Sequence, residues 1–70
     1  MNVNITFMGN SATLANLLSV ERMREETFFV FSIFAEDDLP AEWQNFIRRS
    51  DSTTAMLVFP SEGLSYTVTQ

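Results

Sequence analysis

The segment from Thr27 to Ala35 restricts the fold of this chain more than any other, because apolar side chains occupy both of its faces. Aromatic and β-branched residues dominate the segment, which favours a β-strand. Alternate side chains of a strand point to opposite faces of its sheet. One face therefore carries Phe29, Phe31, Ile33 and Ala35, and the other carries Phe28, Val30 and Phe34. Such a pattern is typical of a central strand covered on both sides.

The chain is short for a fold in which other elements must pack against both faces of a sheet. Its 70 residues suffice for one small domain, residues 1–70, and domains of this size usually gain stability from disulfides, a metal ion or a partner subunit. Cysteine and histidine are both absent, so disulfides are excluded and carboxylates are the only strong metal ligands among the side chains. We expect no cofactor and no metal, which leaves association with another chain.

Three further segments are predicted to be strands from the spacing of their apolar residues: residues 2–8, 53–59 and 64–69. The strand over 53–59 is again apolar on both faces, with Met56 opposite in direction to Leu57. A proline and a glycine in residues 60–63 predict a tight hairpin loop before the last strand. That last strand has one polar face and is expected at a sheet edge, where it could pair with a partner strand.

Two apolar stripes at helical spacing predict two helices. The first follows a strand break at Gly9, is capped by Asn10 or Ser11, and ends near residue 19 or continues to residue 26. Its stripe consists of Leu14, Leu17 and Leu18. The second covers residues 39–49 and has Pro40 in its first turn. Its stripe consists of Leu39, Trp43, Phe46 and Ile47, which predicts that Trp43 belongs to the core.

These elements have the order β-α-β-α-β-β. We predict an α+β domain with a four-stranded, mostly antiparallel sheet and two helices, which can cover one face of the sheet or be divided between its two faces. If both helices cover the same face, the other face is an exposed patch of the size found at interfaces. That patch would contain Phe28, Val30, Phe34 and Met56, with Met8 as an optional fifth member.

The charge of the chain argues against several partners. Nine acidic residues and four arginines give a net charge of -5, which repels nucleic-acid backbones and anionic membrane surfaces. Four of the acidic residues lie close together in the sequence: Glu36, Asp37, Asp38 and Glu42. They are interpreted as complementing the dipole of the second helix, as contacting a basic protein surface, or as binding a divalent cation, for which the glycine-containing loop is lacking.

Catalysis is not expected from this composition. Histidine, cysteine and lysine, the usual sources of a tunable base or nucleophile, are all absent. The turn at Gly9 lacks the second glycine and the lysine of a phosphate-binding loop. The longest apolar stretch, residues 28–35, is too short to span a bilayer, and no export signal is visible. We expect a cytoplasmic location, in the host cytoplasm if the chain is viral.

The sequence thus predicts a non-enzymatic protein that binds another protein, with a basic surface as one option for that partner. The candidate contact residues are Phe28, Val30, Phe34, Met56, Glu36, Asp37, Asp38 and Glu42. As a class, a small acidic chain without catalytic groups is similar to the accessory inhibitors that bacteriophages use against host enzymes and defence systems, although no motif assigns a family. Two alternatives stay open, namely a structural homo-oligomer such as a homodimer, and an acidic nucleic-acid mimic that fills a basic groove.

Overall fold

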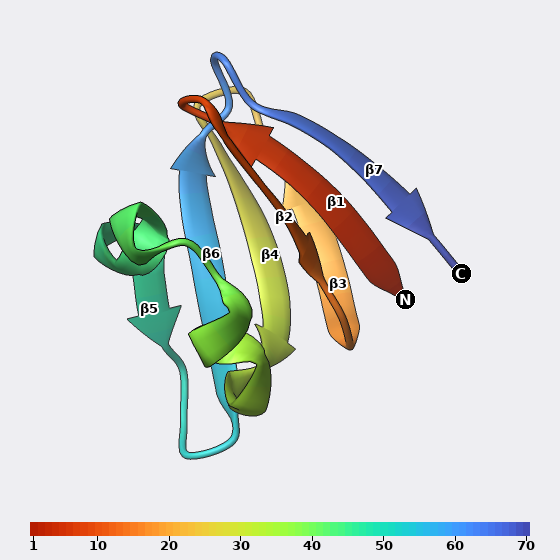
Figure 1. Ribbon diagram of the computed structural model, residues 1–70, viewed down its shortest axis with the longest axis vertical. Helices are drawn as coiled ribbons and strands as arrows, with labels where there is room; N and C mark the ends of the chain where they lie inside the picture. The colour runs from red at the N-terminus through yellow and green to blue at the C-terminus, as the bar shows by residue number, and fades with distance from the viewer.

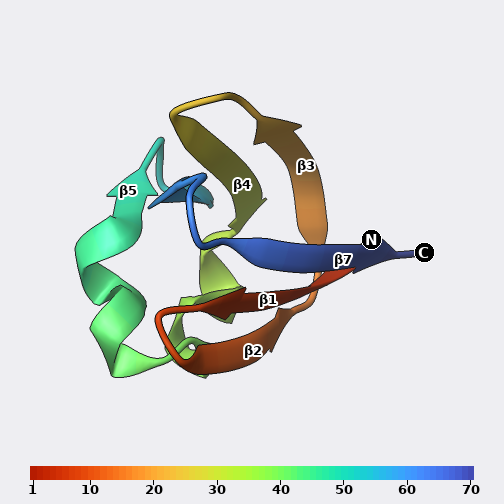
Figure 2. The ribbon, with the colours of Figure 1, turned by 90° about the horizontal axis from the view of Figure 1, so that it is seen from above.

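The computed structural model describes all residues, 1–70, as two antiparallel β-sheets that face each other (Figures 1 and 2). The three-stranded sheet has the order β2 (Asn10–Leu14), β1 (Asn2–Phe7) and β7 (Ser65–Thr69). The four-stranded sheet has the order β3 (Leu17–Arg22), β4 (Glu26–Ser32), β6 (Thr54–Pro60) and β5 (Ile47–Arg49). Two short 3-10 helices, η1 (Ile33–Asp38) and η2 (Ala41–Phe46), connect β4 with β5.

The four strands predicted from the sequence are present as β1, β4, β6 and β7, with small differences at their ends. The largest difference concerns β4, which ends at Ser32 because the chain turns into η1 at Ile33. The domain is therefore mostly β with a few short helices, and it fits the α+β class only roughly. The predicted order β-α-β-α-β-β and the single four-stranded sheet are not correct, because seven strands form two sheets.

The helix predicted after Gly9 does not form, and its residues make β2 and β3 instead. Met8 and Gly9 both have positive φ angles, 52° and 81°, and form a two-residue hairpin turn between β1 and β2. Asn16, with φ 60°, lies in the turn that carries the chain into the other sheet. Leu14 ends β2 and Leu17 begins β3, and both side chains are buried. Their spacing of three residues therefore arises from the turn between two strands and not from a helix.

The second predicted helix is shorter than expected and has 3-10 geometry. It ends at Phe46, because the next three residues pair with β6 as strand β5, with Ile47 opposite Leu57. The apolar stripe still identifies the inward side correctly, since Trp43 is 1% exposed. No helix in the structure combines the length and the apolar character needed to cross a bilayer.

The core lies between the two sheets and is closed on one side by η1 and η2. It is a single cluster of 14 buried side chains, to which β1 contributes Val3, Ile5 and Phe7. Phe59 of β6 is at its aromatic centre, with ring centroids 4.6 Å from Phe7 and 5.1 Å from Trp43. The inner face of the four-stranded sheet is thus fully used by the core, and its outer face is left to other contacts.

Candidate functional site

The outer face of the four-stranded sheet carries an apolar patch over its two central strands. Phe28 and Val30 of β4 point away from the core, because their neighbours Phe29 and Phe31 point into it. In the register of the sheet, Val30 lies opposite Met56 and Phe28 lies opposite Val58. All four side chains are half-buried. We call the group Phe28, Val30, Met56 and Val58 the outer patch.

Opposite charges border the outer patch on its two sides. On β3, Glu21 lies opposite Phe28 and Ser19 lies opposite Val30. On β5, Arg48 lies opposite Met56. The guanidinium of Arg48 donates hydrogen bonds of 3.1 and 3.2 Å to the backbone carbonyls of Asn45 and Ile47, and the side chain remains exposed. The patch therefore has a carboxylate on the β3 side and a guanidinium on the β5 side.

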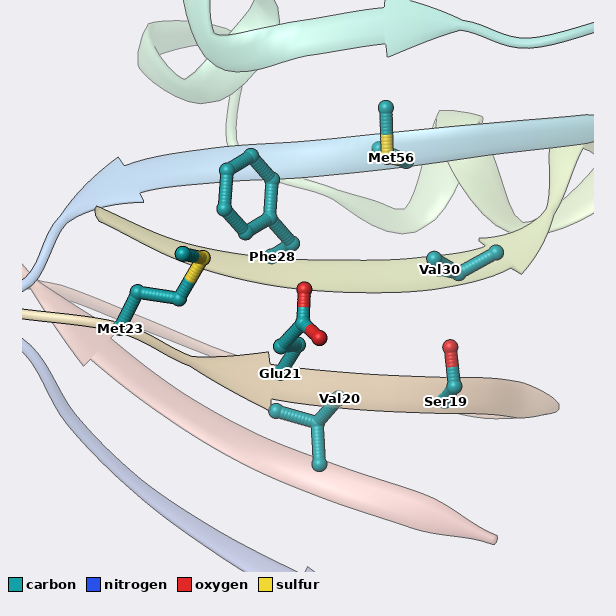
Figure 3. A pocket seen from close by; sticks show the side chains of 7 residues that line it. All are labelled: Ser19, Val20, Glu21, Met23, Phe28, Val30 and Met56. Carbon is teal, nitrogen blue, oxygen red and sulfur yellow. The ribbon is translucent and has the colours of Figure 1, made fainter.

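A groove of about 500 Å³ runs along the β3 side of the patch. Its lining residues are Ser19, Val20, Glu21, Met23, Phe28, Val30 and Met56 (Figure 3). In the figure, Val20 points away from the others, toward the three-stranded sheet, while the Glu21 carboxylate lies between Phe28 and Val30 in projection. The groove is therefore an open apolar surface with one ionisable group.

Met23, at the end of this groove, belongs to the turn between β3 and β4, and a buried hydrogen-bond chain fixes that turn. The hydroxyl of Ser61 donates to the carbonyl oxygen of Met23 over 2.6 Å. The backbone N–H of Ser61 donates to the carbonyl of Glu25 over 3.0 Å. The Met23 side chain is 52% exposed, so the turn presents an apolar group to solvent from a fixed backbone.

The structure brings together three of the predicted contact residues, Phe28, Val30 and Met56, and separates Phe34 from them. Because β4 ends at Ser32, the alternation along the strand does not extend to Phe34, which lies on η1 and is 84% exposed. Sequence reasoning left six residues out of the site: Ser19, Val20, Glu21, Met23, Arg48 and Val58. The signal for Val58 was its spacing from Met56. Arg48 depends on the unpredicted strand β5, and the other four depend on the unpredicted hairpin of β3 and β4.

The four predicted acidic contact residues lie on η1 and η2, outside the outer patch. The two carboxylate oxygens of Glu36 each accept a hydrogen bond of 2.9 Å from Nη2 of Arg49, which joins η1 to β5. Asp37, Asp38 and Glu42 are exposed. No three acidic side chains of the structure lie close enough together to hold a metal ion.

A second, smaller depression of about 230 Å³ lies beside the β1–β2 turn. Its lining residues are Met8, Asn10, Glu42, Trp43, Asn45 and Phe46. The indole Nε1 of Trp43 is buried and has no hydrogen-bond partner. This depression is only about half the volume of the groove on the outer sheet face. The unpaired Trp43 N–H is buried, and it costs stability.

Comparisons of the chain with protein-family models, with curated proteins and with solved structures found no match. The candidate site is therefore defined by its geometry, namely the outer patch, the adjoining groove and the two bordering charges of Glu21 and Arg48.

Proposed function

We propose that this chain is a small non-enzymatic protein-binding module that acts as an inhibitor or antagonist by placing its outer patch on the surface of a larger protein. The observation that carries the proposal is the contiguous, half-buried set of Phe28, Val30, Met56 and Val58 on a sheet face that the core does not use. No other segment of the chain lies over the groove side chains in Figure 3.

The energetics of the patch favour a protein partner. Apolar surface that is removed from water contributes about 25 cal/mol per Å², and four side chains that are already ordered in a sheet lose little conformational entropy on binding. Scattered exposed apolar residues are common on proteins, but a contiguous patch is typical of an interface. The fixed turn that holds Met23 extends this apolar surface beyond the strands.

The chemistry of the groove supports binding rather than catalysis. Glu21 is its one ionisable side chain and Ser19 its one hydroxyl, and no second group with a tunable pKa lies among the lining residues. An active site needs an acid, base or nucleophile supported by a second such group. An apolar groove with one carboxylate on its rim is instead suited to a partner that inserts an apolar side chain and places a basic one beside it.

The proposal is tested by affinity capture from a lysate of candidate host cells with three tagged proteins: wild type, Phe28→Asp and Thr67→Asp. Thr67 is exposed on β7, so Thr67→Asp adds the same negative charge on the three-stranded sheet without removing an apolar side chain. We expect a protein that wild type and Thr67→Asp retain equally and that Phe28→Asp loses. Equal retention by Phe28→Asp would contradict the proposal.

A fourth protein, with Asp37, Asp38 and Glu42 all changed to Lys, distinguishes binding through the outer patch from the alternative that the chain mimics a nucleic acid. Glu36 is left intact in this variant because its carboxylate is bound to Arg49 and its reversal would disturb the fold. If the outer patch is the contact surface, the lysine variant retains the target in high salt. Loss of the target by the lysine variant, together with retention by Phe28→Asp, would favour the mimic.

A further inference from the structure

We infer that, in the free protein, the outer patch is covered by the outer patch of a second copy of this chain, in a weak two-fold dimer in which Glu21 of each copy faces Arg48 of the other. This inference rests on the proposed function, because it takes the outer patch to be a protein-contact surface. It adds how the surface is regulated, since a target must displace the second copy before it can bind.

The two bordering charges determine the symmetry of the dimer. When two identical sheets meet face to face, the two-fold axis lies in the plane between them. An axis parallel to the strands places β3 of one copy over β5 of the other, which brings Glu21 opposite Arg48 twice. An axis perpendicular to the strands places β3 over β3 and brings two Glu21 carboxylates together. The pattern of Glu21 and Arg48 therefore selects the parallel axis. Glu26, which shares the outer face at the start of β4, lies near Glu26 of the second copy in this arrangement and opposes association.

The same rotation also matches the apolar side chains in size. It places β4 over β6, because these are the two central strands, and it keeps each row of the sheet over the same row. Phe28 then lies over Val58 of the second copy, and Val30 lies over its Met56. A larger side chain thus meets a smaller one at both positions, which allows the two faces to interdigitate.

The offset between Glu21 and Arg48 is within reach of an ion pair. Glu21 shares a row with Phe28, and Arg48 shares the next outward-facing row with Met56. Two residues along a strand correspond to about 7 Å, which a flexible arginine side chain spans. Arg48 donates to two backbone carbonyls through Nη1 and keeps its other guanidinium donors for a carboxylate.

The size of the face indicates a weak and reversible dimer. Strands of six, seven, seven and three residues, spaced about 4.8 Å apart with about 3.4 Å per residue, give a face on the order of 400 Å² for each copy. A stable complex usually buries about 800 Å² on each partner. The net charge of -5 on each copy also opposes association, although salt at physiological strength screens charges more than about 8 Å apart. A target with a larger matching surface can therefore displace the second copy.

The test is sedimentation equilibrium over micromolar to millimolar concentrations of the whole chain. The mass of the wild type should rise from the 8.0 kDa of one chain toward twice that value. Glu21→Arg and Arg48→Glu should each weaken association at least tenfold, because each creates two pairs of like charges across the two-fold axis. The variant with both changes restores opposite charges and should associate within a few-fold of the wild type. Glu62→Arg, an equal change of charge in the exposed β6–β7 loop, should not weaken association.

Two results would overturn the inference: a wild type that remains monomeric at millimolar concentration, or a doubly changed variant that associates as weakly as the single variants. If a reversed charge prevents folding, Glu21→Gln and Arg48→Gln remove the same charges and should each weaken association. Failure of this inference differs from failure of the proposed function. A monomer whose Phe28→Asp variant still loses its target contradicts only the dimer, whereas a charge-dependent dimer whose Phe28→Asp variant keeps the target contradicts only the binding proposal.

Discussion

Thr27 and Ser61, 34 positions apart in the chain, share a buried hydrogen bond of 2.8 Å between their hydroxyl groups. The Ser61 hydroxyl donates its proton to the carbonyl of Met23, so Thr27 is the donor to Ser61. This short chain of hydroxyls joins β4, the β6–β7 loop and the β3–β4 turn. It is the part of the core that determines where Met23 stands at the end of the groove.

We expect Ser61→Ala to lower the free energy of unfolding by about 2–3 kcal/mol, because it leaves both the Thr27 donor and the Met23 carbonyl without a partner. Thr27→Val should cost only about 1 kcal/mol, since Ser61 can still donate to Met23. Urea unfolding followed by Trp43 fluorescence gives both values. Equal costs for the two variants would show that Ser61 does not link the two groups.

The unpartnered Nε1 of Trp43 leads to a prediction about the core. Trp43→Phe removes buried apolar area but also removes the unsatisfied N–H, so the two effects offset and the change in unfolding free energy should be within about 1 kcal/mol. Trp43→Ala should cost about 3–5 kcal/mol, which would leave a domain this small largely unfolded. Thermal unfolding monitored by circular dichroism tests both. A loss above about 3 kcal/mol for Trp43→Phe would mean that the indole N–H is bonded in solution.

The turn at Met8 and Gly9 should accept a stabilising substitution. Met8 has a positive φ that favours asparagine or glycine, and its side chain is 76% exposed. Met8→Asn should therefore raise the unfolding free energy by about 0.5–1 kcal/mol, measured by urea titration. Gly9→Ala is the matched control in the opposite direction. A Cβ at Gly9 meets no atom within 4 Å, so any loss of stability there arises from backbone strain at φ 81°.

Asp51, in the turn between β5 and β6, makes the folding stability of the domain depend on pH in the acidic range. The backbone N–H of Thr53, its hydroxyl and the backbone N–H of Thr54 all donate to the Asp51 carboxylate and hold its pKa below the usual value of 3.8. A lowered folded-state pKa stabilises the fold above the unfolded-state pKa, and this stability is lost as the pH falls through the folded-state pKa.

Asp51→Asn keeps an acceptor oxygen and removes the charge, so it should melt below the wild type at neutral pH. The difference between the two melting temperatures should shrink as the pH falls below about 3.8, because the wild-type carboxylate then also becomes neutral. The measurement is a series of thermal melts of both proteins from neutral to acid pH. A difference that is constant with pH would contradict a role for the charge. The effect is expected to be small because Asp51 is exposed.

Four of the seven strands, β1, β4, β6 and β7, were predictable from residue alternation, whereas β2, β3 and β5 lie in segments predicted to be helical. The prediction of a first helix was wrong, because the spacing of Leu14 and Leu17 fits both a helix and two strands joined by the tight turn at Asn16. A better signal was the pair Met8 and Gly9 between two alternating segments, which is typical of a two-residue hairpin. The second helix was cut short because Ile47 pairs with Leu57, a tertiary contact that overrides local propensity.

In the candidate site, too, features set by local strand geometry were predictable, whereas features set by tertiary contacts were not. Phe28, Val30 and Met56 were predicted to share a face because strand alternation requires only local geometry. The ion pair of Glu36 with Arg49 and the end position of Met23 depend on elements that meet through the fold, so no local pattern indicates them. The acidic segment therefore resembled a free binding surface in the sequence, while in the structure one of its carboxylates holds η1 to β5.

The pairing of β1 with β7 has a consequence for the synthesis of the chain. Of the seven strands described, β1 leaves the ribosome before the others and β7 after them, yet β1 lies between β2 and β7 in the finished sheet. One edge of β1 therefore remains unpaired throughout translation of the domain, with Val3 and Ile5 awaiting the side chains that cover them. Closure of the sheet brings the two ends of the sequence together and is slow for that reason. A chain whose synthesis stalls before Ser65 would expose an unpaired strand edge and apolar side chains. Such an incomplete domain is prone to aggregation and is a typical substrate for chaperones.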